Sequence, residues 1–268
     1  MLRQSSQRPG RAIQRSAPRR AFGVGAALAL LLVARAARAA LPGISLDWHD
    51  CPGGATSSAD LTFDCSSNTA QFPLVGSLLL SAPEMNLIGA ELVIDVQHTA
   101  ATMPDWWRLD GSGSGGCRAG ALSTSFDFTG TPGCTDAWLA NGFGGIQSFS
   151  IGPPDHPALN QARIKVVAAV TSDNAVTMNA NVQYGVVITL LSSDHSTGAG
   201  ICAGCSGRAC LVLNSILLRR VPGMGVDLFL STPASAQSNW ATWQGSGADC
   251  ALVPVRRMTW GAIKSLYR

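Results

Sequence analysis

The chain has 268 residues and is long enough to bury a full hydrophobic core. Its first 39 residues hold eight of the nineteen Lys and Arg residues and none of the sixteen Asp and Glu residues. The whole chain therefore has a net charge of +3, whereas residues 40–268 have a net charge of −5. The eleven basic residues of that remainder are scattered and form no stripe that would follow a phosphate backbone. Nucleic acid is therefore not an expected partner.

Residues 1–39 have the pattern of a cleaved export signal. Arginines without any acidic residue precede a short apolar run over 21–33, and Ala37-Arg38-Ala39 gives the small-x-small pattern of a cleavage site. The apolar run is shorter than the ~20 residues that cross a bilayer, so we expect no membrane span in the mature protein. The pair Arg19-Arg20 fits a twin-arginine signal weakly, and the general secretory route is favoured. The expected location is the periplasm or the exterior of the cell.

Alternating apolar residues predict a series of short strands behind this leader. The clearest lies at 90–97, where Leu92, Ile94 and Val96 alternate with more polar neighbours, a period that places one face on a core. It predicts a central antiparallel strand. In chain order, the other predicted strands are 43–48, 59–65, 72–80, 122–128, 149–152, 162–171, 175–178, 182–191, 210–218 and 226–231. The stretch 138–145 is ambiguous.

This pattern predicts an all-β fold, namely a single antiparallel β-sandwich, jelly-roll-like, over residues 40–258. No composition break divides it into two domains. Residues 259–268 place apolar side chains at helical spacing behind Thr259 and predict a short C-terminal helix. Either this helix packs on the sandwich or it is a docking or sorting tag.

All eight cysteines follow the leader, and an even number in an exported chain predicts a disulfide framework. They are Cys51, Cys65, Cys117, Cys134, Cys202, Cys205, Cys210 and Cys250. Eight cysteines allow 105 pairings. Proximity in the sequence favours Cys51–Cys65 and Cys117–Cys134, with Cys250 joined to one member of the 202/205/210 cluster and the other two members joined to each other.

The densest aromatic surface in the sequence is the pair Trp106-Trp107, which follows Asp105 and precedes a Gly-rich loop. These three residues are the candidate ligand-binding site, since paired indoles offer platforms for sugar rings or for a hydrophobic partner. The competing interpretation is core closure against a disulfide. Trp240 and Trp243 are three residues apart, so on one strand they face opposite sides.

Two metal or redox interpretations of the sequence carry less weight than disulfides. His195, Cys202, Cys205 and Cys210 together match the ligand set of a structural zinc, but an exported chain meets oxidants first. A redox pair at Cys202-x-x-Cys205 would need a strand-to-helix junction, which this region lacks. Loop acids for calcium are Asp47, Asp50 and Asp110, without a repeat spacing. We expect no cofactor and no metal.

Catalytic signatures are weak. There is no Gly-x-Ser-x-Gly, and the four histidines are scattered. The Gly-rich loop 111–116 lacks the Lys-Ser/Thr of a phosphate-binding loop. A glycan-active hydrolase would use two of the carboxylates near the Trp pair, which are Glu84, Glu91, Asp95 and Asp105.

The sequence therefore predicts an exported, non-catalytic β-sandwich protein with a binding or surface-structural role. The partner classes are a glycan or a surface protein, and the surface-structural role predicts a homo-oligomer. The alternative function is the glycan-active hydrolase.

Overall fold

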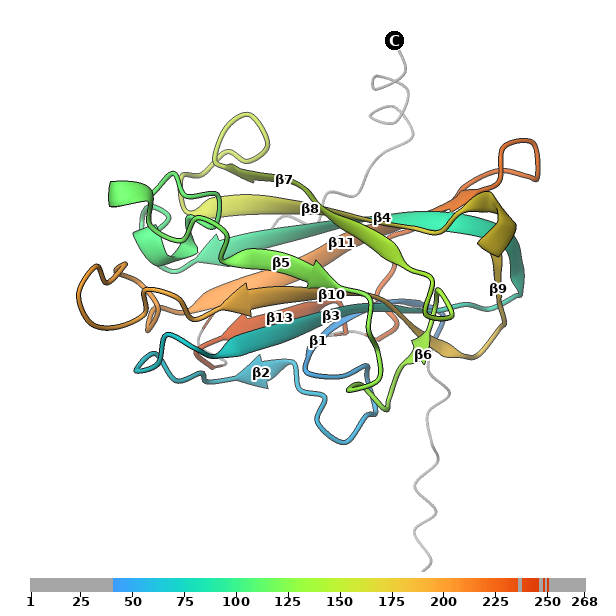
Figure 1. Ribbon diagram of the computed structural model, residues 1–268, viewed down its shortest axis with the longest axis horizontal. Helices are drawn as coiled ribbons and strands as arrows, with labels where there is room; N and C mark the ends of the chain where they lie inside the picture. Colours follow the sequence, from blue (N-terminus) through green and yellow to red (C-terminus); the bar gives the residue numbers. More distant parts are fainter. Residues whose placement is uncertain (1–40, 236–237, 246–247, 249, 251–268) are drawn as a thin grey trace, which may run out of the picture. The chain divides into compact units, whose positions relative to one another are not determined.

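The structure is a computed structural model that describes residues 41–235, 238–245, 248 and 250. These residues form two β-sheets that pack face to face, as Figure 1 shows, with three short 3-10 helices in the loops, at Asp105–Trp107 (η1), Ser114–Gly116 (η2) and Ser172–Asn174 (η3). The all-β sandwich that the sequence predicts is confirmed.

The smaller sheet has five strands and the larger sheet has eight. In the smaller sheet the order is β1 (Gly43–Trp48), β3 (Gln71–Leu79), β10 (Gln183–Ser192) and β5 (Leu122–Ser125), and β6 (Thr135–Asp136) also pairs with β10. In the larger sheet the order is β2 (Asp60–Leu61), β13 (Trp240–Trp243), β11 (Ala209–Arg220), β4 (Glu84–His98), β8 (Gln161–Ala169) and β7 (Phe143–Ile151); β12 (Leu228–Leu230) pairs with β11 and β9 (Val176–Met178) with β4. Pairing is antiparallel except for β6 with β10 and β2 with β13.

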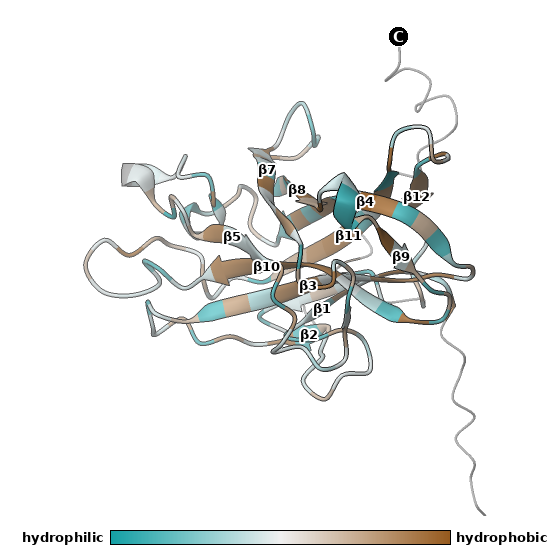
Figure 2. Cartoon of the chain, turned by 45° about the vertical axis from the view of Figure 1, so that its right-hand side comes forward, coloured by the Kyte–Doolittle hydropathy of each residue, from teal (hydrophilic) through white to brown (hydrophobic). Residues whose placement is uncertain are grey.

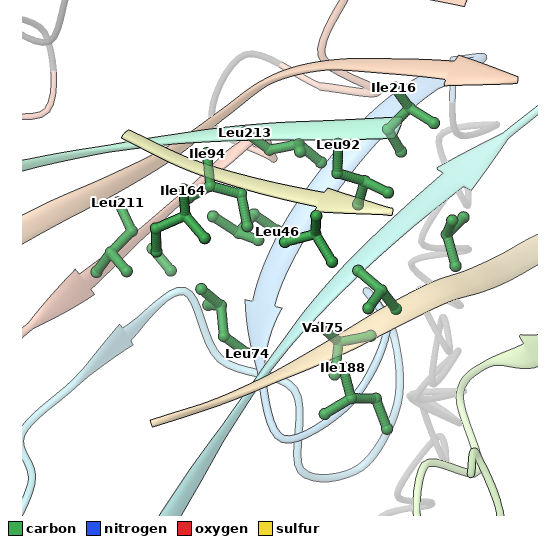
Figure 3. Packing of buried hydrophobic residues seen from close by; sticks show 14 of the residues in the cluster. Leu46, Leu74, Val75, Leu92, Ile94, Ile164, Ile188, Leu211, Leu213 and Ile216 are labelled. Carbon is green, nitrogen blue, oxygen red and sulfur yellow. The ribbon is translucent and has the colours of Figure 1, made fainter. Parts of the chain in front are cut away.

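The predicted central strand is β4, which lies between β11 and β8 and is antiparallel to both. Its residues Leu92 and Ile94 are fully buried and face Leu46 and Leu74 of the smaller sheet across the core (Figure 3). Figure 2 shows that β10 and β11 also consist largely of hydrophobic residues. Alternation of apolar residues in facing strands thus positions the two sheets.

Three predicted strands are shorter than expected: the strand predicted at 226–231 covers only Leu228–Leu230, and in the other two a side chain takes backbone bonds that would extend the strand. The strand predicted at 59–65 is only two residues long, and the N–H and C=O of Phe63 bond to the side chain of Gln244. The strand predicted at 122–128 ends at Ser125, whose Oγ accepts from the N–H of Asp127. The Ser125 hydroxyl competes locally with the ladder, whereas Gln244 reaches Phe63 from a segment that is distant in the sequence.

Four disulfides join all eight cysteines, but most of the predicted pairing was wrong. The bonds are Cys51–Cys134, Cys65–Cys205, Cys117–Cys202 and Cys210–Cys250. Only the link from Cys250 to the 202/205/210 cluster is confirmed. Cys51 and Cys65 separate because β1 belongs to the smaller sheet, whereas β2 pairs with β13 in the larger one. Such a framework is typical of an oxidising, extracytoplasmic compartment.

The export signal at 1–39 and the helix predicted at 259–268 lie outside the described residues, as does the proposed boundary at residue 258. Within the part of the chain that the structure describes, no helix is long and apolar enough to cross a membrane.

The pairing of Cys51 with Cys134 can be tested by peptide mapping. Digestion without reduction should release one peptide pair that contains both cysteines, and a pair that joins Cys51 to Cys65 would contradict the structure. The bond closes a loop with a sequence separation of 83 residues. Replacing both cysteines by alanine should therefore lower the free energy of unfolding by about 4.5 kcal/mol in the chain-entropy estimate, measured by denaturant titration.

Candidate functional site

The candidate platform Trp106-Trp107 lies in the core. The two side chains are 0% and 1% exposed, and the rings pack against Trp243 with centroid distances of 4.8 and 5.6 Å. Nε1 of Trp106 donates to Oγ of Ser196 at 2.8 Å. Neither ring offers a free face to a ligand in this structure, and both occupy the position that the core-closure interpretation predicts.

A buried arginine, Arg118, holds the Trp pair in place. Its guanidinium carbon lies 4.0 Å from the centre of the Trp106 ring, and its Nε donates to the Trp106 carbonyl at 3.0 Å. The two other guanidinium nitrogens donate to the carbonyls of Ser192 and Asp194. Burial lowers the pKa of Arg118 to about 10. No sequence pattern indicates this role, because Arg118 follows a Gly-rich loop and belongs to no motif.

The four carboxylates considered for glycan hydrolysis do not form an opposed pair. Each pairs with a different arginine: Glu84 with Arg220, Glu91 with Arg219, Asp95 with Arg163, and Asp105, which is half-buried, with Arg108. Glu91 and Asp95 are four residues apart on β4, which is about 13 Å along a strand. Hydrolytic pairs are ~5–9.5 Å apart. Glu84 and Asp105 lie at opposite ends of β4.

Asp95 forms the most deeply buried ion pair of the four. Its two oxygens accept from Nε and Nη2 of Arg163 at 2.7 and 2.8 Å, and Nε2 of His156 lies 3.1 Å from Oδ1. Burial alone would raise the pKa of Asp95, but His156 and Arg163 outweigh it and hold that pKa below its usual value. The group fastens the β7–β8 loop, which carries His156, to the outer face of the larger sheet.

The cysteines of the 195–210 stretch bind three different partners in disulfides, so none is a thiolate that could hold zinc or cycle with its neighbour. His195 is exposed and its Nδ1 lies 3.2 Å from the Gly200 carbonyl. Within the described residues, no cluster of three or more His, Cys, Asp or Glu side chains has a geometry that suits a metal ion.

Two of the acids considered for calcium have structural partners instead. Asp50 is fully buried, and its carboxylate accepts from the N–H groups of Cys51 and Gly133. It thereby clamps the turn after β1 to the turn that carries Cys134. Asp47 is 8% exposed and accepts from Oγ of Ser57 at 3.1 Å. The third acid, Asp110, is exposed and accepts from the N–H of Ser112.

The structure shows an open groove of about 780 Å³ where β5 and β7 lie side by side. These are edge strands, β5 of the smaller sheet and β7 of the larger one. The lining residues are Thr124, Ser125, Phe126, Asp127, Phe128, Thr129, Cys134, Asp136, Ala140, Gly142, Phe143 and Gly144. The groove therefore combines three phenylalanines with two carboxylates and several hydroxyls, and we call it the β5 groove.

The side chains of the β5 groove differ in how they can meet a ligand. Phe143 is 54% exposed at the start of β7, Phe126 is half-buried, and Phe128 is buried. Asp127 is exposed, and hydrogen bonds from the backbone and side chain of Thr129 keep its pKa below the usual value. Asp136 accepts from the N–H groups two and four residues further on and so fixes the 136–144 wall. The groove is thus apolar, anionic and preformed.

The sequence prediction missed this site. Phe126 and Phe128 belong to the strand predicted at 122–128, and Phe143 lies in the ambiguous stretch 138–145, so none of the three carries a binding signal in the sequence. No family model, no curated protein and no solved structure matches this chain. The groove must therefore be judged by its own geometry and charge.

Because the ion pair of Asp95 with Arg163 is buried, neutralising Asp95 should cause a large loss of stability. Asp95→Asn should lower the free energy of unfolding by about 3–5 kcal/mol, because it leaves Arg163 buried without its carboxylate. Glu91→Gln is the matched control: Glu91 and Arg219 are 39% and 43% exposed, so its loss should be about 1 kcal/mol or less. Denaturant titration measures both, and equal losses would show that burial of the Asp95 pair does not matter.

The contribution of Asp47 to the free energy of unfolding should depend on pH with the opposite sign to that of a salt-bridged acid. Burial raises the pKa of Asp47 from 3.8 to about 6. The folded chain therefore binds a proton that the unfolded chain releases, so this group's contribution to stability falls as the pH rises from about 4 to about 6 and stays low above that. Asp47→Asn should stabilise the fold by about 2–3 kcal/mol at pH 7.5 and leave it unchanged near pH 3.5. The difference between the two unfolding curves as a function of pH measures this, and a pH-independent difference would refute it.

Proposed function

We propose that this chain is an exported, non-catalytic binding protein whose ligand site is the β5 groove. The observation that carries the proposal is the groove itself, because it leaves Phe143 more than half exposed beside two carboxylates on a fold that buries its other large aromatic clusters. Exposed aromatic side chains on a rigid, concave surface are typical of recognition sites.

Export is supported by two features. The leader pattern at 1–39 predicts it, and four disulfides are what a chain in an oxidising compartment retains. Both features support an action of the protein in the periplasm or outside the cell.

A binding role is supported over glycan hydrolysis because most of the candidate acidic side chains already have structural partners. The carboxylates near the Trp pair are engaged by arginines, and burial of Trp106 and Trp107 removes the sugar platform next to them. In the β5 groove, Asp136 is occupied by backbone N–H groups. Its neighbour Asp127 is exposed and ionised, which suits the attraction of a ligand more than the transfer of a proton.

The test compares Phe143→Ala with Leu159→Ala, a matched control that removes a similarly exposed side chain from the β7–β8 loop away from the groove. Native mass spectrometry of protein recovered after export should show a co-purifying mass on the wild type. That mass should bind about tenfold more weakly to Phe143→Ala, the size expected when one aromatic contact is lost. The control should bind it normally. Equal retention by both variants would exclude the groove as the ligand site.

A further inference from the structure

The outer edge of β5 is a backbone template for an added strand. β5 pairs with β10 on one side, and no strand that the structure describes pairs with its other side. The N–H of Ser192 donates to the carbonyl of Ala121, and the alternation of an antiparallel ladder then directs the backbone groups of Leu122, Thr124 and Phe126 away from β10. An extended segment can pair with such an edge.

The β5 groove supplies what such a segment needs on its other side. Phe126 and Phe143 offer apolar contacts for alternate side chains of an added strand, since a strand presents every second residue to the same face. Asp127 and Asp136 line the same groove, and no basic residue does. The surface therefore favours an extended segment that carries both apolar and basic side chains.

We propose that the occupant is the segment 251–258 of a second copy of this chain, docked as an added strand on β5. This inference rests on the proposed function of the groove and names its ligand. Residues 251–268 include Arg256, Arg257, Lys264 and Arg268 and no acidic residue, so their charge complements the groove.

The pattern of this segment also suits an edge position. Val253 and Val255 share one face of an extended strand and have their backbone groups on the same side, so both can pair with β5. Pro254 lies between them and directs its missing donor away from β5, the place at which a sheet edge tolerates proline. Arg256 and Arg257 follow directly in the sequence, so docking of the segment would bring them toward the carboxylates of the groove.

The segment must come from another copy because its own groove is out of reach. Cys250 is bonded to Cys210, which packs with Val212 in a cluster separate from the main core, on the outer face of the larger sheet. The strands β4, β8 and β7 follow β11 toward the groove, a distance of roughly 14 Å at one strand spacing each. Val253 lies three residues after Cys250, and three extended residues span at most ~11 Å.

The experiment measures self-association of the exported chain by sedimentation at several concentrations. The wild type should associate, and Arg256→Glu with Arg257→Glu should weaken association about tenfold, as should Asp127→Lys. Asp127→Lys combined with Arg256→Glu and Arg257→Glu should restore it, because the charges are then exchanged. Asp110→Lys, on an exposed loop outside the groove, is the control and should have no effect. Failure of the exchange to restore association would overturn the proposal.

A backbone variant tests strand addition separately from charge. Thr124→Pro removes an outward N–H and leaves the bonds of β5 to β10, so it should abolish association while the thermal unfolding midpoint changes little. Association that survives Thr124→Pro would overturn the strand geometry.

A binding experiment with the synthetic peptide 251–258 identifies the occupant. The peptide should bind the wild type and should not bind Phe143→Ala. A chain that stays monomeric and ignores the peptide, yet loses a co-purifying glycan or foreign protein on Phe143→Ala, overturns this inference and leaves the proposed function intact. A chain in which Phe143→Ala changes nothing overturns both.

Discussion

The packing around Trp243 is the constraint on which the rest of the structure depends. Its ring lies on β13 and contacts Trp48 of the smaller sheet as well as Trp106 and Trp107 of the loop after β4. Its Nε1 donates to the carbonyl of Cys205, which the disulfide to Cys65 fixes. One side chain therefore joins both sheets and two cross-linked loops, and burial of these large rings contributes far more than any single polar contact.

The packing around Trp243 does not include the turn that follows β5, and other interactions stabilise that turn. There the turn after β1 and the turn at 128–134 meet through the Cys51–Cys134 bond and through Asp50, whose buried carboxylate accepts two backbone N–H groups. Added side-chain atoms on Gly133 would strike the Asp50 carboxylate, so only glycine fits this approach. The wall of the β5 groove is thus held covalently and by buried hydrogen bonds, and a ligand would pay little entropy to order it.

The sequence predicted the strands well because alternation is a local signal. The pattern at 90–97 marked β4 as central, and the opposite faces expected for Trp240 and Trp243 agree with their burial in two separate clusters. The disulfide pairing was not local. Cys65 meets Cys205 because β2 pairs with β13, a contact across the whole chain that no spacing between cysteines encodes. Proximity in sequence therefore misled the assignment.

The burial of the Trp pair could not be predicted for a related reason. Aromatic residues are equally visible in a sequence whether a fold buries them, as it does Trp106, or exposes them, as it does Phe143. What separates the two is which strands end at the edges of the sheets. Edge strands in natural proteins are kept short and charged to prevent indiscriminate pairing. β5 has four residues and runs directly into the half-buried Phe126 and the exposed Asp127. The exposed carboxylate repels an acidic strand and attracts a basic one. Protection of this edge and selection of its partner therefore follow from the charge of the same residue.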